Sequence, residues 1–220
     1  PALRASLNRR TLLTYLGAGV LLSFNWGLYV WGINSGHVVE TSLGYFINPL
    51  VSVVLGVIFL RERLRPLQWL PVALATAGVL YLTFSFGKLP LIALGLAFSF
   101  GFYGLIKKLA PLNSLHGLTL ETGSLFVVAL AYLVVAELRG VGSFGHVEPL
   151  TSLLIALSGI ITAIPLLLFA TGARQVPLST LGLLQYFAPT IQFLIGILVY
   201  HEPFTQDRLI GFSIIWLALI

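Results

Sequence analysis

Long apolar runs separated by short polar segments dominate the chain. An α-helix needs about 20 apolar residues to cross a hydrocarbon layer about 30 Å thick, because each residue rises by about 1.5 Å. Eight runs reach or approach this length, which predicts eight membrane-spanning helices: Thr11–Ile33, Val38–Leu60, Pro66–Phe84, Leu89–Ile106, Leu115–Glu137, Leu150–Gly172, Pro177–Tyr200 and Arg208–Ile220. The connections are only a few residues long, apart from the Gly-rich segment Arg139–Pro149. The predicted fold class is therefore an all-α integral membrane bundle with no soluble domain between its spans.

The composition supports this interpretation and adds two exclusions. Apolar residues make up 58% of the 220 residues and charged residues 9%, with a mean hydropathy of +1.00, which is far from a soluble globular domain. The chain has no cysteine, so disulfide bonds and thiolate metal sites are excluded. It opens without the pattern of a cleaved signal peptide. Because it begins with Pro1 and its last apolar run has no polar flank, we expect it to be part of a longer protein.

The basic residues separate into two sets when the connections are assigned alternately to the two sides of the membrane. Nine of the twelve fall on one side, namely Arg4, Arg9, Arg10, Arg61, Arg63, Arg65, Lys107, Lys108 and Arg174, whereas Lys88, Arg139 and Arg208 fall on the other. Lys and Arg concentrate in cytoplasmic loops, so the larger set predicts the cytoplasmic side of a plasma membrane. The net charge of +5 is thereby explained without a nucleic-acid partner.

The chain also carries a degenerate internal repeat with an offset of 140 residues. Residues 11–80 align with residues 151–220 without a gap, and YFINPLVSVVLGVIFLRERL has its copy in QYFAPTIQFLIGILVYHEPF. Pro49 matches Pro189 in this alignment, and Glu62 matches Glu202. One period contains five predicted spans, and an odd number of spans reverses the orientation of the copy. Inverted repeats with a site at their interface are typical of secondary transporters.

A unit of five helices predicts a bundle of about ten in two inverted repeats, of which about eight are present. Residues 1–86 then hold the last three helices of the first repeat. Residues 87–220 hold the second repeat without the end of its final helix.

The segment SFNWGLYVWGINSGHVVETSLGYFINPLVSVVLGVIFLRERLRPLQW resembles the RarD group of the EamA family, in the drug/metabolite transporter superfamily. Its most specific parts are Asn25-Trp26, Glu40–Leu43 and Tyr45–Pro49. The resemblance implies ten transmembrane helices in two inverted five-helix repeats, with both termini in the cytoplasm and a central pathway for small organic molecules. Compared with this family, the chain lacks the first two helices and the last few residues.

Two acidic residues lie inside predicted spans, where a polar side chain is costly unless it is paired or hydrated. Glu40 lies three residues inside its span near the outer end, and Glu121 lies about two turns inside its span near the inner end. Each is a candidate for contacting a substrate or carrying a coupling proton. The alternative for Glu40 is an interfacial carboxylate near a helix N-terminus, where the helix dipole favours it.

Small or polar residues follow Glu40 at every fourth position, at Gly44, Asn48, Ser52 and Gly56. Residues at this spacing share one face of a helix, and small residues there allow a neighbouring helix to approach closely. Pro49 frees a carbonyl of the preceding turn, and Pro189 does so in the copy, so both are predicted helix breaks. Paired interruptions of this kind indicate a binding site. We expect the pathway to be lined by Tyr45, Asn48, Gln185 and Tyr186, with a plain structural kink as the alternative.

Further candidates for the pathway lie in other spans. Asn25, Trp26 and Tyr29 combine an amide with aromatic rings, which suits a flat organic substrate. The alternative is ordinary helix packing along the small residues beside them, Gly19, Ser23 and Gly27. Tyr103 and Gln192 are additional candidates, with interhelical hydrogen bonding as their alternative role.

No residue pattern indicates catalysis, a metal or a cofactor. Glu62 and Glu202 lie at span ends, where we interpret them as structural residues that fix the turn into the next helix. The four histidines have no zinc spacing, and nucleotide-binding and hydrolase motifs are missing from the sequence. We therefore expect a non-enzyme whose partners are the lipid bilayer, a small organic solute and, if transport is coupled, protons.

The function favoured by these patterns is secondary transport of small organic metabolites or drugs by alternating access. A passive channel or a lipid flippase on the same scaffold is one alternative. A membrane receptor or assembly subunit that binds without moving a solute is another.

Overall fold

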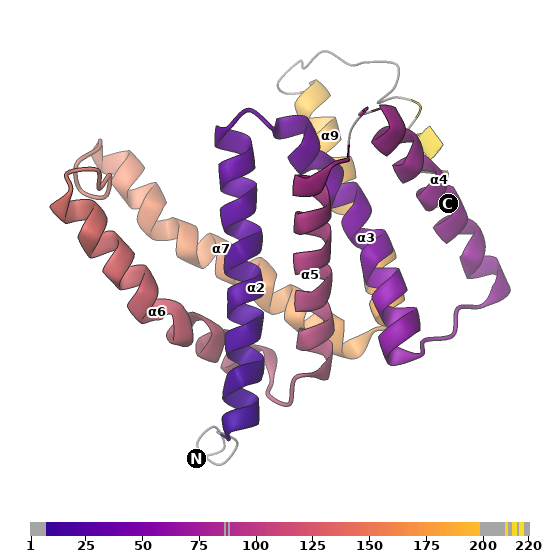
Figure 1. The fold of residues 1–220 in the computed structure, drawn as a ribbon, viewed down its shortest axis with the longest axis horizontal. Coiled ribbons are helices and arrows are strands. Elements are labelled where there is room, and N and C mark those ends of the chain that lie inside the picture. The colour runs from indigo at the N-terminus through magenta and orange to yellow at the C-terminus, as the bar shows by residue number, and fades with distance from the viewer. Residues whose placement is uncertain are drawn as a thin grey trace. The chain divides into compact units, whose positions relative to one another are not determined.

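The computed structural model describes residues 8–85, 87, 89–198, 210, 213, 214, 216 and 217, and within these residues all regular structure is helical. The elements are α2 (Arg9–Asn34), α3 (Val38–Leu60), the short 3₁₀-helix η1 (Pro66–Gln68), α4 (Trp69–Ser85), α5 (Leu91–Leu109), α6 (Ser114–Leu138), α7 (Pro149–Gln175), α8 (Leu178–Leu184) and α9 (Phe187–Leu198) (Figure 1). The all-helical fold class is thus confirmed for the described part of the chain.

Within the described part of the chain, six helical segments are long and apolar enough to cross a membrane, as in a multi-pass membrane protein. They correspond to the first six predicted spans, and α3 has the predicted bounds, Val38–Leu60. The hydrocarbon forces every backbone group in a span to find its partner within the helix, so span boundaries follow local composition closely. The eighth predicted span, Arg208–Ile220, lies largely outside the described residues.

The seventh predicted span is not the single helix that its apolar run suggested. It consists of α8 and α9, which are separated by a turn at Gln185 and Tyr186. Pro189 is the third residue of α9, where its missing N–H removes no intrahelical bond because the first N–H groups of any helix have no partner there. Pro49, in contrast, lies inside the continuous helix α3.

The chain divides into two compact units, and the division runs through α2 and α5. Unit 1 contains residues 1–20 and 106–175, and unit 2 contains residues 21–105 and 176–220. Unit 1 has a small buried cluster of Tyr15, Ala110 and Leu112. Unit 2 has a larger core, to which α3, α4, α5 and α8 contribute, together with Tyr186.

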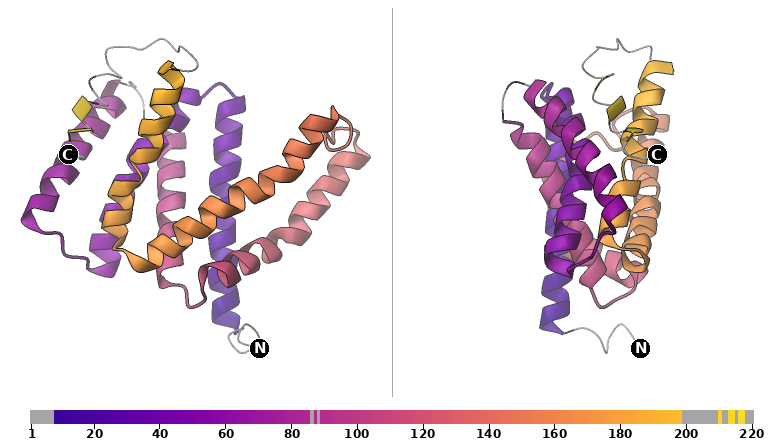
Figure 2. Two further views of the ribbon diagram at one scale, coloured as in Figure 1. Left: turned by 180° about the vertical axis from the view of Figure 1, so that it is seen from behind. Right: turned by 90° about the vertical axis from the view of Figure 1, so that its right-hand side faces the viewer.

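Helix α3 is central to unit 2, where α8 and α9 lie along it (Figure 2). Gly182 permits the close approach of α8, because a Cβ atom at this position would lie 2.7 Å from the carbonyl oxygen of Pro49. At Gly101 of α5, a Cβ atom would lie 2.7 Å from a methyl carbon of Val51. Small residues at these contacts allow backbones to pack closely, which is the main source of helix association in lipid.

In unit 1, α6 and α7 form a hairpin connected through residues 139–148 (Figure 1). His146 Nε2 lies 2.6 Å from Glu137 Oε1 in this connection. Most apolar side chains of the two helices are exposed, as expected for surfaces that face lipid.

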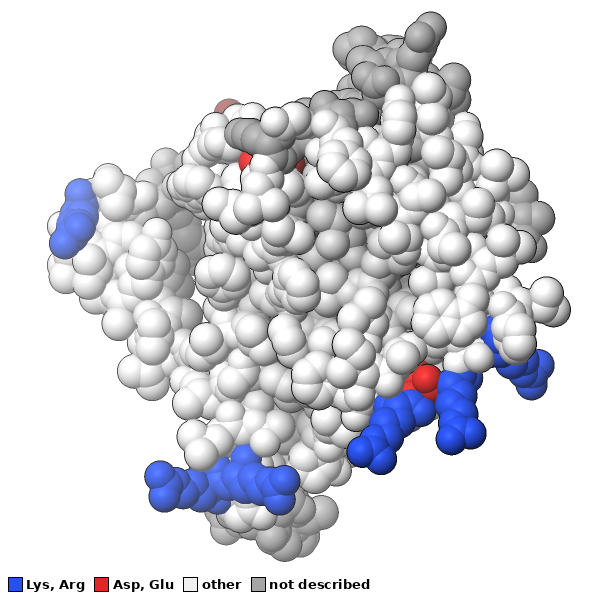
Figure 3. Space-filling model, turned by 45° about the vertical axis from the view of Figure 1, so that its right-hand side comes forward, with Lys and Arg blue, Asp and Glu red and all other residues white. Residues whose placement is uncertain are grey.

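On the face shown in Figure 3, Lys and Arg side chains lie at the margins, and most of the surface between them is uncharged.

Candidate functional site

The polar and small residues of α3 form one buried face, as their spacing predicts. Glu40, Asn48 and Ser52 are 4%, 8% and 2% exposed. At Gly44, a Cβ atom would lie 3.2 Å from the carbonyl oxygen of Ala93 in α5. At Gly56, it would lie 3.1 Å from the backbone nitrogen of Ser179 in α8. This face therefore packs against α5 and α8 within unit 2.

An amide pair links α3 to the turn between α8 and α9. Asn48 Nδ2 donates to Gln185 Oε1 over 2.7 Å. In the same place, the hydroxyl of the fully buried Tyr186 donates to the carbonyl oxygen of Phe46 over 3.1 Å. Two buried atoms of the pair, Asn48 Oδ1 and Gln185 Nε2, have no hydrogen-bond partner among the described residues. The pair thus retains one acceptor and one donor that no described group satisfies.

A pocket opens next to this amide pair. It is lined by Asn25, Gly44, Tyr45, Asn48, Leu96 and Phe100, and its empty volume is about 250 Å³ including the space at its mouth. Asn25 Nδ2 donates to the carbonyl oxygen of Leu96 over 2.9 Å and to Ser99 Oγ over 2.8 Å. Both N–H bonds of this amide are therefore used, which leaves its oxygen as the remaining hydrogen-bonding atom.

Two aromatic residues of the lining, Tyr45 and Phe100, contact further aromatic rings. The ring of Tyr29 packs edge-on against Tyr45 at a centroid distance of 5.8 Å. Trp26 is half exposed and contacts Tyr29 in turn at 6.4 Å. The ring of the fully buried Tyr103 lies 5.8 Å from that of Phe100. The side chain of Gln192, another predicted pathway residue, lies outside the described residues.

Glu40 does not line this pocket. Its Oε1 accepts a hydrogen bond from the backbone N–H of Ile92 over 2.8 Å, in the first turn of α5. The N-terminal N–H groups of a helix lack intrahelical partners and carry partial positive charge, so a buried carboxylate is favoured there. The helix that Glu40 caps is α5, not its own helix α3.

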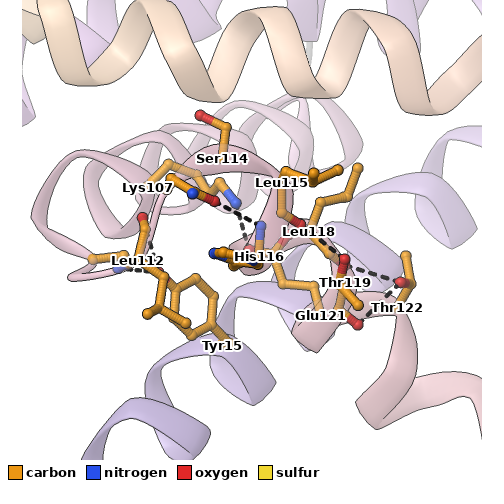
Figure 4. A network of polar contacts seen from close by, with 12 residues as sticks. Tyr15, Lys107, Leu112, Ser114, Leu115, His116, Leu118, Thr119, Glu121 and Thr122 are labelled. Carbon is orange, nitrogen blue, oxygen red and sulfur yellow. Dashed lines mark hydrogen bonds and ion pairs between the residues drawn. The ribbon is translucent and has the colours of Figure 1, made fainter. Parts of the chain in front are cut away.

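Glu121 belongs to unit 1, where it forms a buried ion pair. Lys107 Nζ lies 2.6 Å from Glu121 Oε1, and the two side chains are 3% and 1% exposed. Figure 4 shows the pair beside Tyr15, whose ring centroid lies 5.7 Å from Lys107 Nζ. Gly117 makes room for this arrangement, because a Cβ atom there would lie 2.7 Å from Cε1 of Tyr15 and 3.2 Å from Lys107 Nζ.

Sequence reasoning missed the role of Lys107, which was counted only as a cytoplasmic topology charge. The available signal was the short connection between α5 and α6, which folds the last turn of α5 back against α6. The same region uses other basic residues structurally. Arg174 donates to the carbonyl oxygens of Ala110 and Leu112, and Lys108 Nζ donates to that of Ala173 over 3.2 Å.

Glu62 is a structural residue, as the sequence predicted, but it stabilises a different helix from the expected one. We predicted that it fixes the turn into the next helix, but its carboxylate instead caps α8, which lies 116 residues further along the chain. Oε1 accepts from Leu178 N at 2.7 Å, and Oε2 accepts from Ser179 N at 2.9 Å and Ser179 Oγ at 2.7 Å. Arg61, in the left-handed conformation with φ 54°, ends α3 just before it.

The described residues contain no group of three His, Cys, Asp or Glu side chains that could hold a metal ion. The site is instead a set of amides and aromatic rings within an apolar surrounding. Such a set can position a small molecule by hydrogen bonds and ring contacts.

The sequence matches a family of known transporters and several of its individual members. The model of the EamA-like transporter family matches residues 2–84 and 88–220. The chain is 49% identical over 99% of its length to the "Uncharacterized transporter YojE" of Bacillus subtilis (strain 168), of which it covers 72%. It is 50% identical over 96% of its length to "Protein RarD" of Streptomyces exfoliatus, of which it covers 67%.

A more distant relative is the "Chloramphenicol-sensitive protein RarD" of Pseudomonas aeruginosa, with 32% identity over 91% of this chain and 66% of the relative. The predicted likeness to RarD proteins is thereby confirmed. With its membrane-spanning helices and these matches, the chain belongs to the EamA-like transporter family and is a membrane transporter.

Proposed function

We propose that this chain is a secondary-active transporter of small organic solutes, working by alternating access in the plasma membrane. The observation that carries the proposal is the pocket beside the Asn48–Gln185 amide pair. The pair joins a proline-containing helix to the turn between two short helices, and discontinuous helices of this kind form substrate sites in many transporters. Asn25, Tyr45 and Asn48 are the residues that we assign to substrate contact.

The proposed architecture is two inverted five-helix repeats in a bundle of ten. Two observations support it. The family model matches two consecutive segments, separated by residues 85–87. Phe46 and Tyr186 are 140 residues apart, which is the repeat offset, and they are hydrogen-bonded to each other. Equivalent positions meet in this way near a two-fold pseudo-symmetry axis, where transporter sites lie.

Alternating access would then proceed by rocking of one repeat against the other around this site. The turn at Gln185 and Tyr186 interrupts the regular helix between α8 and α9, so it is a suitable hinge. Glu40 and Glu121 remain the proposed carriers of a coupling proton, with uniport or exchange as the uncoupled alternative. A channel or flippase on this scaffold would give flux that does not saturate with solute concentration.

Replacing Asn48 by alanine is expected to lower saturable transport about tenfold. The substitution leaves the buried Gln185 amide without its partner, and an unsatisfied buried polar group costs about 1–3 kcal/mol, of which about 1.4 kcal/mol corresponds to a factor of ten. The measurement is uptake of radiolabelled chloramphenicol, chosen from the name of a relative, into proteoliposomes that contain the intact protein.

Asn34→Ala is the matched control, because Asn34 is exposed at the end of α2. It should retain the uptake rate of the unaltered protein. Saturable uptake that Asn48→Ala leaves unchanged would remove the amide pair from the mechanism. Uptake that rises linearly with concentration in the unaltered protein would instead favour the channel.

The inverted repeat predicts that residues 63 and 206 lie on opposite sides of the membrane. The chain has no cysteine, so single-cysteine variants Arg63→Cys and Gln206→Cys can be labelled without a background signal. A membrane-impermeant maleimide applied to intact cells should label position 206 and should reach position 63 only after permeabilisation. Ser35→Cys, in the connection after α2, serves as an external control. Labelling of both positions from the same side would contradict the inverted repeat.

A further inference from the structure

We propose that the pocket selects uncharged solutes that carry an N–H or O–H hydrogen-bond donor on a flat apolar body. This inference rests on the proposed transport function and names the solute class of the same site. It follows from three properties of the described lining: its lack of charge, its free acceptor atoms and its aromatic rings.

The first property is electrostatic. None of the six lining residues is charged. The two carboxylates of unit 2 that the structure describes are engaged elsewhere, Glu40 with Ile92 N and Glu62 with the start of α8. The arginines Arg61, Arg63 and Arg65 are exposed beyond the end of α3. A solute ion in this pocket would lose its hydration without gaining an opposite charge, and the effective cost of that is several kcal/mol.

The second property is the presence of two amide oxygens in the lining, those of Asn25 and Asn48. Asn48 is 8% exposed, and its buried Oδ1 has no partner among the described residues. The Leu96 carbonyl can only accept, so it fixes the orientation of the Asn25 amide and leaves the Asn25 oxygen as a second acceptor. A buried acceptor that meets no donor is costly, and a donor on the solute removes that cost.

The third property is shape. Tyr45, Phe100 and Leu96 supply most of the apolar lining, and Gly44 leaves the wall next to α5 without a side chain. Aromatic side chains prefer offset-stacked or edge-on contacts with other rings, which suits a flat solute. Gln185 Nε2 is an unpaired donor next to Asn48, but Gln185 is not among the residues that line the pocket.

Three small probes of nearly equal size test this inference on the intact protein in detergent. Benzamide is flat and uncharged and has N–H donors. N,N-dimethylbenzamide keeps the ring and the carbonyl but has no donor, and benzoate is an anion without a donor. Binding is measured by equilibrium dialysis and by the rise of the unfolding temperature with probe concentration. We expect benzamide to bind at least about tenfold more tightly than either of the others, which is the effect of one hydrogen bond to a buried acceptor.

Benzoate or N,N-dimethylbenzamide binding as tightly as benzamide would overturn the inference, and so would the absence of binding by all three. Asn48→Ala should abolish the preference for benzamide, whereas Asn34→Ala should keep it. If Asn48→Ala does not fold, the comparison of the three probes on the unaltered protein still decides. Saturable chloramphenicol uptake without the predicted order of binding refutes only the solute class. The predicted order without any saturable uptake refutes only the transport proposal.

Discussion

Replacing Lys107 by methionine should destabilise the protein by about 3–5 kcal/mol, the largest effect that we expect from any single substitution in the chain. Lys107 and Glu121 are 3% and 1% exposed and lie 2.6 Å apart. Removing Lys107 takes a charge partner away from the buried Glu121 carboxylate, in a medium that solvates the carboxylate poorly. Methionine keeps the length and most of the volume of the side chain, so the loss reports the charge and not a cavity. The measurement is chemical unfolding of the purified protein in detergent.

The double variant Lys107→Met/Glu121→Leu should recover most of this loss, because an apolar pair of similar volume is often as stable as a buried ion pair. Lys108→Met is the matched control for the loss of one positive charge in the last turn of α5. Lys108 is less buried and donates to the Ala173 carbonyl over 3.2 Å, so its replacement should cost about 1 kcal/mol. A double variant as unstable as Lys107→Met would show that the pair is not the source of the effect.

The double variant also separates folding from proton coupling. If Glu121 carries a coupling proton, the double variant should remain folded and lose pH-dependent transport. If the pair is only structural, transport and its pH dependence should both survive. Measuring the pH dependence of transport in Glu40→Gln tests the other proposed proton carrier, Glu40, whose carboxylate caps α5 through Ile92 N.

The second large effect is expected at Glu62, whose replacement by alanine should destabilise unit 2 by about 2 kcal/mol. The carboxylate accepts three hydrogen bonds from Leu178 and Ser179, and hydrogen bonds to a charged group contribute more than neutral ones. Helix α8 has only seven residues, too few to be stable without tertiary support. Removing the Glu62 carboxylate leaves the first backbone N–H groups of α8 without their acceptor. The readouts are the unfolding temperature and the protection of the α8 amides from hydrogen exchange.

Three variants make this prediction specific. Glu62→Gln retains one acceptor oxygen and should lose about half as much stability as Glu62→Ala. Gly56→Ala should act in the same direction, because its Cβ would lie 2.7 Å from Glu62 Oε2. Arg63→Ala, at an exposed neighbouring position, should change stability by no more than a few tenths of a kcal/mol. Normal protection of the α8 amides in Glu62→Ala would show that the cap is not needed.

The helices were predictable because each depends mainly on its own composition. An apolar run in lipid must pair its backbone groups internally, so the run itself determines where the helix begins and ends. Val38–Leu60 illustrates this, since the predicted and observed bounds agree. Pro177–Tyr200 illustrates the exception. Its apolar composition predicts one helix, but the turn at Gln185 and Tyr186 is stabilised by contacts with Asn48 and Phe46 in a distant part of the chain.

The candidate site was predictable in its residue types but not in its grouping. Asn25, Tyr45 and Asn48 were each suspected because polar groups in a span need partners, and they meet at one pocket. Glu40 was suspected for the same reason, yet it caps a neighbouring helix. Polarity inside a span indicates that a partner exists, and it does not indicate which helix supplies that partner.

The sequence alone determined that this is a multi-span helical membrane protein, and its motifs indicated the transporter family. Both depend on local properties, namely the hydrophobicity of each run and the identity of neighbouring residues. Only the tertiary structure decided that Lys107 neutralises Glu121, that Glu62 caps α8 and that Asn48 meets Gln185. The physical reason is that hydrogen bonds and ion pairs form between atoms about 3 Å apart, and the close packing of helices around small residues determines which atoms come that near.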